Sequence, residues 1–299
     1  MLSGAGPAFV LGTVQIGLTY GVTNAHDAPA DGYELLSEAA KTGVQTLDTA
    51  QAYGRSEAII GQLLDENPDW RFSIISKIAP DVDSRDRSAV LAACRVSVKR
   101  LGRPLYGCMY HDPAVVFSWN DGAGAGLRDA RDAGLAGRIG VSVYTPEQFR
   151  QALQADGLDI IQAPFNLLDR GLETSGLMDA AISAGCEVHV RSVFLQGLLL
   201  ADPQEVPERL GFMRPWLQRV RDICLQNGVD PLSASVGYVR QRFPEARLVV
   251  GCDDSRQLRR NLALFEEGVL PDKFISMIGN LETPPDIVVN PALWPRVAT

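Results

Sequence analysis

The sequence has few cysteines, and their spacing does not indicate a metal site or a disulfide framework. Five occur among 299 residues, at Cys94, Cys108, Cys186, Cys224 and Cys252. Zinc sites use closely spaced pairs such as CxxC, and small disulfide-rich domains use many more cysteines. We therefore predict that the protein binds no metal and that its cysteines are reduced residues of the core.

Long hydrophobic runs are also missing. No stretch of about 18 consecutive apolar residues occurs anywhere, so a membrane-spanning helix is not expected. The first residues, MLSGAGPAFVLG, have neither the basic segment nor the long apolar segment of a secretion signal. We expect a cytoplasmic protein without a membrane partner.

Positive charge is scarce. The chain has 28 Lys and Arg against 36 Asp and Glu, which gives a formal net charge of -8, and no cluster of basic residues interrupts this excess of acids. Nucleic acids and anionic membranes are bound by basic surfaces. We expect a small-molecule partner instead, while the oligomeric state is left open by the sequence.

What the sequence does contain is a regular alternation of short apolar runs and longer amphipathic segments. Eight runs rich in Val, Ile and Leu occur at residues 8–13, 44–50, 72–78, 105–111, 138–143, 158–164, 186–192 and 246–252. Each is followed by a segment with the apolar spacing of a helix. Eight such units in about 250 residues are typical of a single closed parallel β/α (TIM) barrel, which we predict for one domain over residues 1–299.

Two segments illustrate the predicted helices. Between the third and fourth runs, Ser84 is expected to cap a helix that ends at Gly102. After the fifth run, Thr145 is a predicted N-cap and Pro146 stands at the first helical position, where its missing N–H is not needed.

The alternative architecture is an open doubly wound sheet, which has the same alternation of elements. That fold usually carries a GxGxxG turn after its first strand, whereas this chain has LGTVQIGLTYG there. Two other segments are expected to be irregular: residues 198–207 as a long loop, and the proline-containing tail after Pro271 as coil with one short helix.

Four chemically versatile side chains stand where predicted strands end. Asp48 ends the second run with Tyr53 just beyond it, Lys77 lies at the end of the third run, and His111 ends the fourth. In a parallel barrel the carboxyl ends of the strands carry the reactive groups. We therefore expect these four side chains to converge as a catalytic site.

Their chemistry is complementary. The phenol of tyrosine has an ordinary pKa of about 10, and a neighbouring ammonium from Lys77 is expected to lower that pKa. Asp48 would hold Lys77 in place and keep it charged. His111 would donate or accept a hydrogen bond at the substrate oxygen beside the phenol.

With LDTAQAYGRSE, SK and YHDP in this order, the sequence resembles the aldo-keto reductases, a family of NAD(P)H-dependent barrel enzymes with an Asp, Tyr, Lys and His tetrad. The segments GVSV, IIQAPFNLLDR and VGCDDSRQLRRNL resemble the family's cofactor-binding segments. The resemblance covers nearly the whole chain. It implies the reduction of an aldehyde or ketone to an alcohol, or the reverse, with NADPH as cofactor and NADH also possible.

The resemblance also implies which residues bind the cofactor. Ser142 and Gln162 would bind the nicotinamide carboxamide, with Asn166 supporting that loop, and the adenosine end would lie on residues 251–261, where backbone N–H groups at a helix start would face the phosphate. Asp254 or Ser255 would cap this helix, and Asn261 would lie near the adenine. The full expected set is Thr13, Ser142, Gln162, Asn166, Arg191, Ser192, Gly251, Cys252, Asp253, Gln257 and Asn261.

Three positions depart from the family pattern. Val143 stands where many members have Asn, and Arg191 stands where many have a tyrosine that stacks on the nicotinamide. Arg191 could instead pair with Glu187 or Asp112. At the adenosine end, Asp253 and Asp254 would repel a 2′-phosphate, while the arginines that follow could attract it, namely Arg256, Arg259 and Arg260. We therefore expect NADPH to bind, with less than about 100-fold discrimination, or 2.7 kcal/mol, between the two cofactors.

Two other functions are compatible with the same residues. A barrel lyase could use Lys77 as a Schiff-base nucleophile, which would require a neutral amine. A non-catalytic subunit could bind the cofactor as a sensor for a partner protein. For a reductase, Asp112 and Arg191 suggest a polar, sugar-like carbonyl substrate. An apolar wall would suggest otherwise, and the candidates for such a wall are Val14, Ile16, Tyr20, Phe117 and Trp119.

Overall fold

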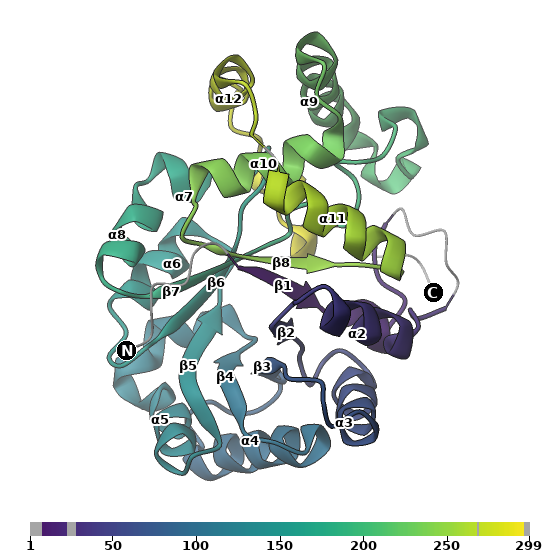
Figure 1. Cartoon of the computed structure of the whole chain (residues 1–299). Coiled ribbons are helices and arrows are strands. Elements are labelled where there is room, and N and C mark those ends of the chain that lie inside the picture. Colours follow the sequence, from purple (N-terminus) through teal and green to yellow (C-terminus); the bar gives the residue numbers. More distant parts are fainter. Residues whose placement is uncertain (1–7, 23–27, 268, 296–299) are drawn as a thin grey trace.

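The computed structural model, which describes residues 8–22, 28–267 and 269–295, contains a closed barrel of eight parallel strands (Figure 1). Each strand pairs with the next, and β1 closes the barrel by pairing with β8. The strands are β1 Phe9–Gly12, β2 Thr46–Asp48, β3 Ser73–Ile78, β4 Leu105–Tyr110, β5 Ala136–Ser142, β6 Ile160–Pro164, β7 Glu187–Arg191 and β8 Arg247–Gly251. Every strand overlaps one of the eight apolar runs, so the predicted fold class is confirmed. The ends of the predicted domain, residues 1–7 and 296–299, lie outside the described residues.

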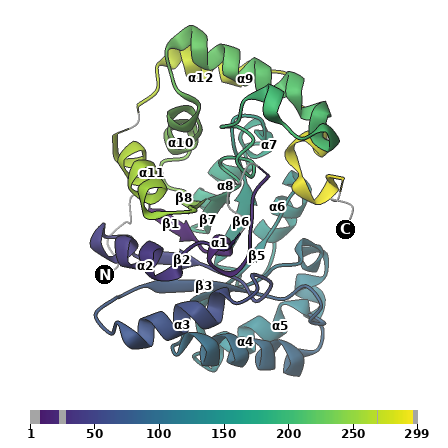
Figure 2. The ribbon, with the colours of Figure 1, turned by 90° about the vertical axis from the view of Figure 1, so that its right-hand side faces the viewer.

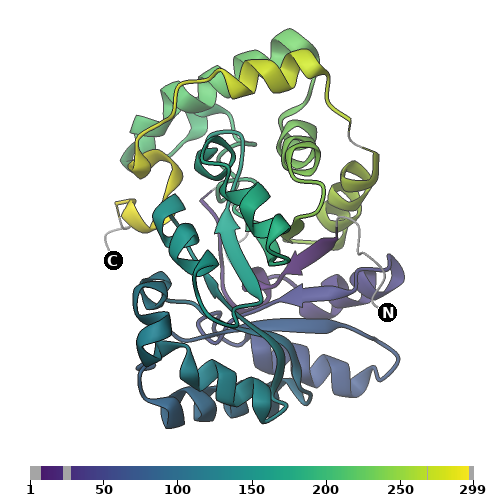
Figure 3. The same ribbon diagram turned by 90° about the vertical axis from the view of Figure 1, so that its left-hand side faces the viewer.

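Helices surround the barrel on its outer side (Figures 2 and 3). They are α1 Val14–Gly17, α2 Gly32–Lys41, α3 Ser56–Glu66, α4 Arg87–Leu101, α5 Ala125–Asp132, α6 Pro146–Leu153, α7 Gly171–Thr174, α8 Leu177–Ser183, α9 Arg214–Asn227, α10 Pro231–Arg242, α11 Ser255–Glu267, α12 Asp272–Gly279 and α13 Asp286–Val289. Because the strands are covered on one face by these helices and on the other by the barrel interior, they are apolar along most of their length.

Every second residue of a strand faces the barrel interior, and successive inward-facing residues form an apolar layer and then a polar one. Ile75, Met109 and Ile160 form a small buried cluster. Two residues further along the same strands, on the same face, stand Lys77, His111 and Gln162. The apolar layer therefore fills the barrel below, and the next inward-facing layer places polar groups at its carboxyl end.

Helix termini agree with the predictions at two positions and differ at a third. Thr145 forms a capping box with Gln148 at the start of α6, and Gly102 ends α4 in the left-handed region with φ of 70°. The predicted cap Ser84 is wrong. Asp86 caps α4 instead, because its carboxylate accepts hydrogen bonds from Ser88 N and Ala89 N.

The prediction of a mostly irregular tail is also wrong. The tail contains α12 and α13, and α12 buries Phe274 and Ile278 on one face while lying beside α9 (Figure 3). The guanidinium of Arg170 donates hydrogen bonds to the carbonyls of Ile278 and Gly279, both at 2.7 Å. Pro271 and Pro285 stand directly before α12 and α13, so they do not prevent helix formation. The predicted loop after β7 is found, with one short 3-10 segment at Pro203–Glu205.

Candidate active site

A buried ion pair lies at the carboxyl ends of β2 and β3. Lys77 Nζ is 2.5 Å from Asp48 Oδ1, and the two side chains are 0% and 3% exposed. The same ammonium donates to the carbonyl of Thr49 at 3.1 Å. The two strands are parallel neighbours, so their ends meet at one edge of the barrel. The predicted contact between Asp48 and Lys77 is therefore present.

Tyr53 and His111 adjoin this pair. Lys77 Nζ lies 5.2 Å from the centre of the Tyr53 ring, and the rings of Tyr53 and His111 meet edge to face with centres 5.8 Å apart. All four side chains that the sequence placed at strand ends are therefore brought together, although they come from two strands, the residue after β4 and a loop.

Two glycines fix the loop that carries Tyr53. Gly54 has φ of 55°, a conformation that other residues rarely adopt. Gly17 lies so close to this loop that a Cβ on it would be 1.8 Å from the carbonyl oxygen of Tyr53. The backbone of the motif AYGRS is thus packed against the backbone of the loop after β1, and this contact positions the phenol next to the ion pair.

Burial determines the protonation of the site. It raises the pKa of the Tyr53 phenol far above the ordinary value, and the negative charge of Asp48 adds to this effect. The expectation that the pKa of Tyr53 lies below its ordinary value is therefore wrong, because burial outweighs the nearby positive charge. Burial also lowers the pKa of Lys77, against the opposing effect of Asp48. The pKa of His111 falls to about 4 through burial and the nearby positive charges of Lys77 and Arg191, so its ring is neutral at pH 7.

A line of hydrogen bonds crosses the end of the barrel from the ion pair. Gln162 Nε2 donates to the second oxygen of Asp48 at 2.7 Å. Ser142 Oγ donates to Gln162 Oε1 at 3.2 Å. Arg191 Nε donates to Ser142 Oγ at 3.2 Å. The three predicted nicotinamide-binding residues are thus joined to Asp48, although their strands are far apart in the sequence.

Arg191 points across the barrel end and does not pair with either carboxylate considered for it. Its guanidinium also donates to the carbonyl of Val143 at 2.9 Å and lies 4.2 Å from the ring centre of Tyr144. Glu187 instead contacts Arg247 at 3.0 Å, and Asp112 accepts a hydrogen bond from Ala114 N.

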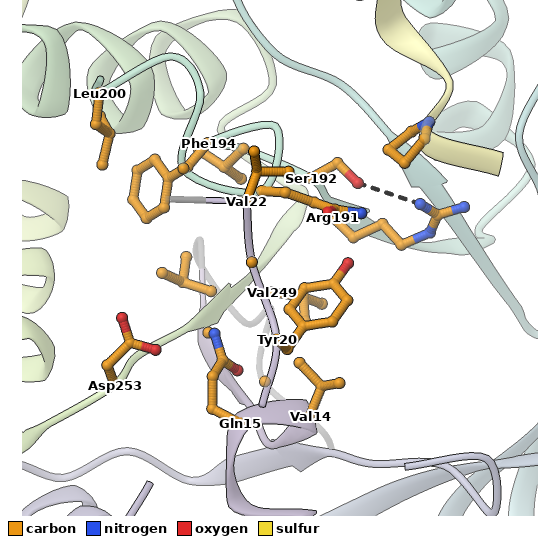
Figure 4. Close-up of a pocket in the computed structure, with 18 of the residues that line it drawn as sticks. Val14, Gln15, Tyr20, Val22, Arg191, Ser192, Phe194, Leu200, Val249 and Asp253 are labelled. Atoms are coloured by element: carbon orange, nitrogen blue, oxygen red, sulfur yellow. Dashed lines mark hydrogen bonds between the residues drawn. The ribbon is translucent and has the colours of Figure 1, made fainter. Parts of the chain in front are cut away.

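A cavity of about 930 Å³ extends from the tetrad to the start of α11 (Figure 4). The sequence-predicted residues that line it are Thr13, Asp48, Tyr53, His111, Ser142, Gln162, Arg191, Ser192, Gly251, Asp253, Gln257 and Asn261. In Figure 4, Asp253 and Gln15 lie toward one end of this cavity and Arg191 and Ser192 toward the other. Catalytic and cofactor-binding candidates therefore share one continuous space.

Three predicted residues do not line this cavity. Lys77 is fully buried and contacts Asp48. Asn166 is buried and supports the loop after β6, because its amide donates to the carbonyl of Ser192 and accepts from Leu168 N and Asp169 N. Cys252 is fully buried and accepts a hydrogen bond from the Asn261 amide at 3.4 Å. Of the remaining cysteines, Cys94, Cys108 and Cys224 are buried and Cys186 is partly buried.

Sequence reasoning missed several residues that line the cavity, including Gln15, Tyr144, Phe194 and Pro291. Tyr144 stands two residues after the end of β5, so inspection of strand ends could have found it. The expected apolar wall is only partly correct. Val14 and Tyr20 line the cavity, but Ile16 and Trp119 are buried in the core and Phe117 is 55% exposed outside it.

The start of α11 differs from expectation. Asp254 caps the helix, as predicted, by accepting from Gln257 N at 2.8 Å. The N–H of the first helical residue, Ser255, donates to Glu34 Oε1 of α2 at 3.1 Å. Two of the backbone donors expected to face a cofactor phosphate are thus bound by carboxylates of this chain. The contact of Glu34 with this helix could not be predicted from the sequence, because Glu34 is 221 positions away from Ser255.

Neither a metal cluster nor a membrane span is found in the parts of the chain that the structure describes. Over these residues, no group of three or more His, Cys, Asp or Glu side chains is placed to hold a metal ion. Among the helices of the same residues, none has the length and apolar character needed to cross a membrane.

Comparison with protein families gives a match to the aldo/keto reductase family over residues 8–282. The chain is 27% identical over 265 residues to a protein of Escherichia coli named NADH-specific methylglyoxal reductase, covering 77% of this chain and 81% of the relative. It is 28% identical over 283 residues to an uncharacterised oxidoreductase of Mycobacterium tuberculosis, covering 85% and 82%. The solved structure of a Bacillus halodurans aldo-keto reductase superimposes with a TM-score of 0.71 at 17% identity, covering 96% of this chain and 94% of the other, which shows a shared fold.

The ion pair predicts a large effect of Lys77→Met on stability. The substitution leaves the buried carboxylate of Asp48 without its cation, and breaking a buried pair in this way costs about 3 to 5 kcal/mol of unfolding free energy. Urea denaturation would measure it. The double variant Asp48→Leu with Lys77→Met removes both charges and should recover at least half of the loss. Equal stability of Lys77→Met and the wild type would contradict a tight buried pair.

Proposed function

The chain belongs to the aldo-keto reductase family, and on that premise we propose that it reduces an aldehyde or ketone to an alcohol with a reduced nicotinamide cofactor, or catalyses the reverse. The observation that carries the proposal is the ion pair of Asp48 and Lys77 beside Tyr53 and His111, at one end of the cavity of about 930 Å³. Apolar packing of a barrel end does not require this combination of groups.

The cavity offers polar groups suited to such a cofactor. Gln15 Oε1 and His111 Nδ1 are buried without a hydrogen-bond partner, which is unusual for buried polar atoms. Ser142 and Gln162 border the same space at the tetrad end and donate and accept a hydrogen bond between them. They would replace this bond by hydrogen bonds to the carboxamide of the cofactor. Asp253, Gln257 and Asn261 would hold the adenosine end.

When bound, the cofactor supplies hydride to the carbonyl carbon of the substrate. Tyr53 then gives its proton to the carbonyl oxygen as a general acid. His111, neutral at pH 7 because its pKa is about 4, would donate a hydrogen bond to the same oxygen. Lys77 and Asp48 position the phenol, and the positive charge of Lys77 stabilises the phenolate that the proton transfer leaves behind.

A Schiff-base lyase is disfavoured by the position of Lys77. A nucleophilic amine must reach the substrate, yet this side chain is 0% exposed and does not line the cavity. Its ammonium already donates to Asp48 and to the carbonyl of Thr49. For these reasons we assign Lys77 to a positioning and electrostatic role.

The form of the cofactor is part of the proposal. The sequence led us to expect NADPH with NADH possible, but the contacts at the start of α11 favour NADH, and a relative from Escherichia coli is named as NADH-specific. We therefore propose NADH as the preferred form. A cytoplasmic location stays a prediction from the sequence.

The first prediction concerns Tyr53→Phe. The substitution removes only the hydroxyl, so carbonyl reduction loses its proton donor while the cavity keeps its shape. We expect kcat to fall by about 10²- to 10⁴-fold, the usual contribution of a positioned general acid. Cofactor affinity, measured by fluorescence titration, should change less than about twofold. Full activity of this variant with a good substrate would end the proposed mechanism.

The pH dependence of reduction follows from the raised pKa of Tyr53. Reduction needs the protonated phenol, so the rate falls as pH rises through the pKa of that group. Because burial and Asp48 raise this pKa, the fall should lie above about pH 10, the value for free tyrosine. A profile of kcat/KM from pH 6 to 10 should therefore show no fall that depends on Tyr53. A midpoint below pH 9 that disappears in Tyr53→Phe would show that Lys77 dominates over burial.

Substrate preference is expected to favour small, hydroxyl-bearing carbonyl compounds. Arg191 and His111 place hydrogen-bond donors at the reacting end of the cavity, where Tyr144 and Tyr20 also lie. We expect kcat/KM for aldoses and short hydroxyaldehydes to exceed that for steroid and aromatic ketones by at least about tenfold, or 1.4 kcal/mol. A panel of both classes at fixed cofactor would decide, and preference for the apolar ketones would refute a sugar-like substrate.

A further inference from the structure

We propose that Glu34 and Asp253 make this enzyme select NADH over NADPH, with Glu34 occupying the position where a 2′-phosphate would bind. The inference rests on the proposed function, because it assumes that the adenosine end of the cofactor lies at the start of α11. Neither residue takes part in the proposed proton transfer. They would act on binding alone.

The first argument is that the backbone donors at the start of α11 are already used. A helix start attracts an anion through its free N–H groups and the positive end of the helix dipole. Here Ser255 N donates to Glu34 Oε1 at 3.1 Å, and Gln257 N donates to Asp254 Oδ1 at 2.8 Å. A phosphate could bind these groups only by displacing carboxylates that are covalently part of the chain.

The second argument concerns the three arginines that follow. Each lies within 4 Å of a carboxylate: Arg256 at 2.9 Å from Asp254, Arg259 at 3.1 Å from Glu38, and Arg260 at 3.9 Å from Asp230. A cation that already faces a carboxylate attracts a phosphate less than a free one does. These pairs are exposed, so they offset only in part the cations that could have favoured NADPH, least at Arg260, which also lines the main cavity.

The third argument is the charge of the space that a 2′-phosphate would enter. A second cavity of about 580 Å³ adjoins the first and shares Gln15, Tyr20 and Asp253 with it. Its lining contains four carboxylates and one arginine, namely Asp31, Glu34, Asp253, Asp254 and Arg256. A phosphate ester there would add nearly two negative charges beside these acids.

Asp253 would strengthen the binding of NADH, whereas Glu34 would weaken that of NADPH. Its backbone N–H and one carboxylate oxygen are held by the Gln257 amide at 3.0 and 3.1 Å, which fixes the side chain in place. It lines the main cavity, and Figure 4 shows its carboxylate directed toward that space. A carboxylate so placed can accept hydrogen bonds from ribose hydroxyls, which NADH keeps free and NADPH esterifies at the 2′ position.

The test is calorimetric binding to the full chain without substrate, so that it does not depend on catalysis. The probes are NADH and NADPH, together with ADP and adenosine 2′,5′-bisphosphate, which isolate the adenosine end. For the wild type we expect NADH to bind at least tenfold more tightly than NADPH, and ADP more tightly than the bisphosphate.

Three variants assign the effect. Glu34→Ala should tighten NADPH by at least fivefold and change NADH by less than twofold. Adding Asp253→Asn should weaken NADH by at least threefold and bring the two affinities within threefold of each other. The control Asp179→Asn removes an exposed carboxylate of α8, on the side of the barrel away from α2 and α11 in Figure 1, and should leave the ratio unchanged.

The outcomes separate this inference from the proposed function. Failure of the wild type to bind either dinucleotide would overturn the reductase assignment itself. Binding of both with equal affinity, or tighter binding of NADPH, would overturn only the selection. The same holds if Glu34→Ala leaves the NADPH to NADH ratio unchanged, or if Asp179→Asn shifts it as much, since the effect would then be one of net charge.

Discussion

The buried contact between Asp48 and Lys77 is the interaction on which the rest of the site depends. Two charges at 0% and 3% exposure are stable only when each is fully paired. Asp48 satisfies this condition with both oxygens, one toward Lys77 and the other toward Gln162. From Gln162 the hydrogen bonds continue through Ser142 to Arg191. The charge that must be neutralised on β2 therefore orders side chains on β3, β5, β6 and β7.

The cavity has opposite charge at its two ends. The tetrad end contains the cations Lys77 and Arg191, which together with burial, the larger cause, lower the pKa of His111 and keep its ring neutral. At the other end Asp253 and Arg260 line the cavity, and Glu34 of α2 and Asp254 line the second cavity that adjoins it. A ligand that spans both ends must present electron-rich groups to the first and hydroxyl donors to the second. This polarity is the electrostatic basis for the proposed choice of NADH.

Local sequence patterns predicted the helices and strands well. They predicted the pKa values of buried groups and the first residues of helices less well. The caps at Thr145 and Asp254 were predicted from residue type. Ser84 was predicted as the cap of α4, but the cap is Asp86, whose carboxylate lies next to the first free N–H groups of the helix. The pKa of Tyr53 was expected to fall and instead rises, since the expectation included the charge of Lys77 but not the loss of water around the phenol. Burial is a property of the folded chain and is not visible in a motif.

The sequence by itself determined the eight strands and the convergence of Asp48, Tyr53, Lys77 and His111, because the carboxyl ends of neighbouring parallel strands must meet at one end of a barrel. Only the tertiary structure decided which groups those residues bond. Gln162 reaches Asp48 across 114 positions through closure of the barrel, and Glu34 reaches Ser255 across 221 positions because α2 packs beside α11. Separations of 114 and 221 residues along the chain do not indicate that these side chains are in contact. Each depends on how helices and strands pack once β1 has closed against β8.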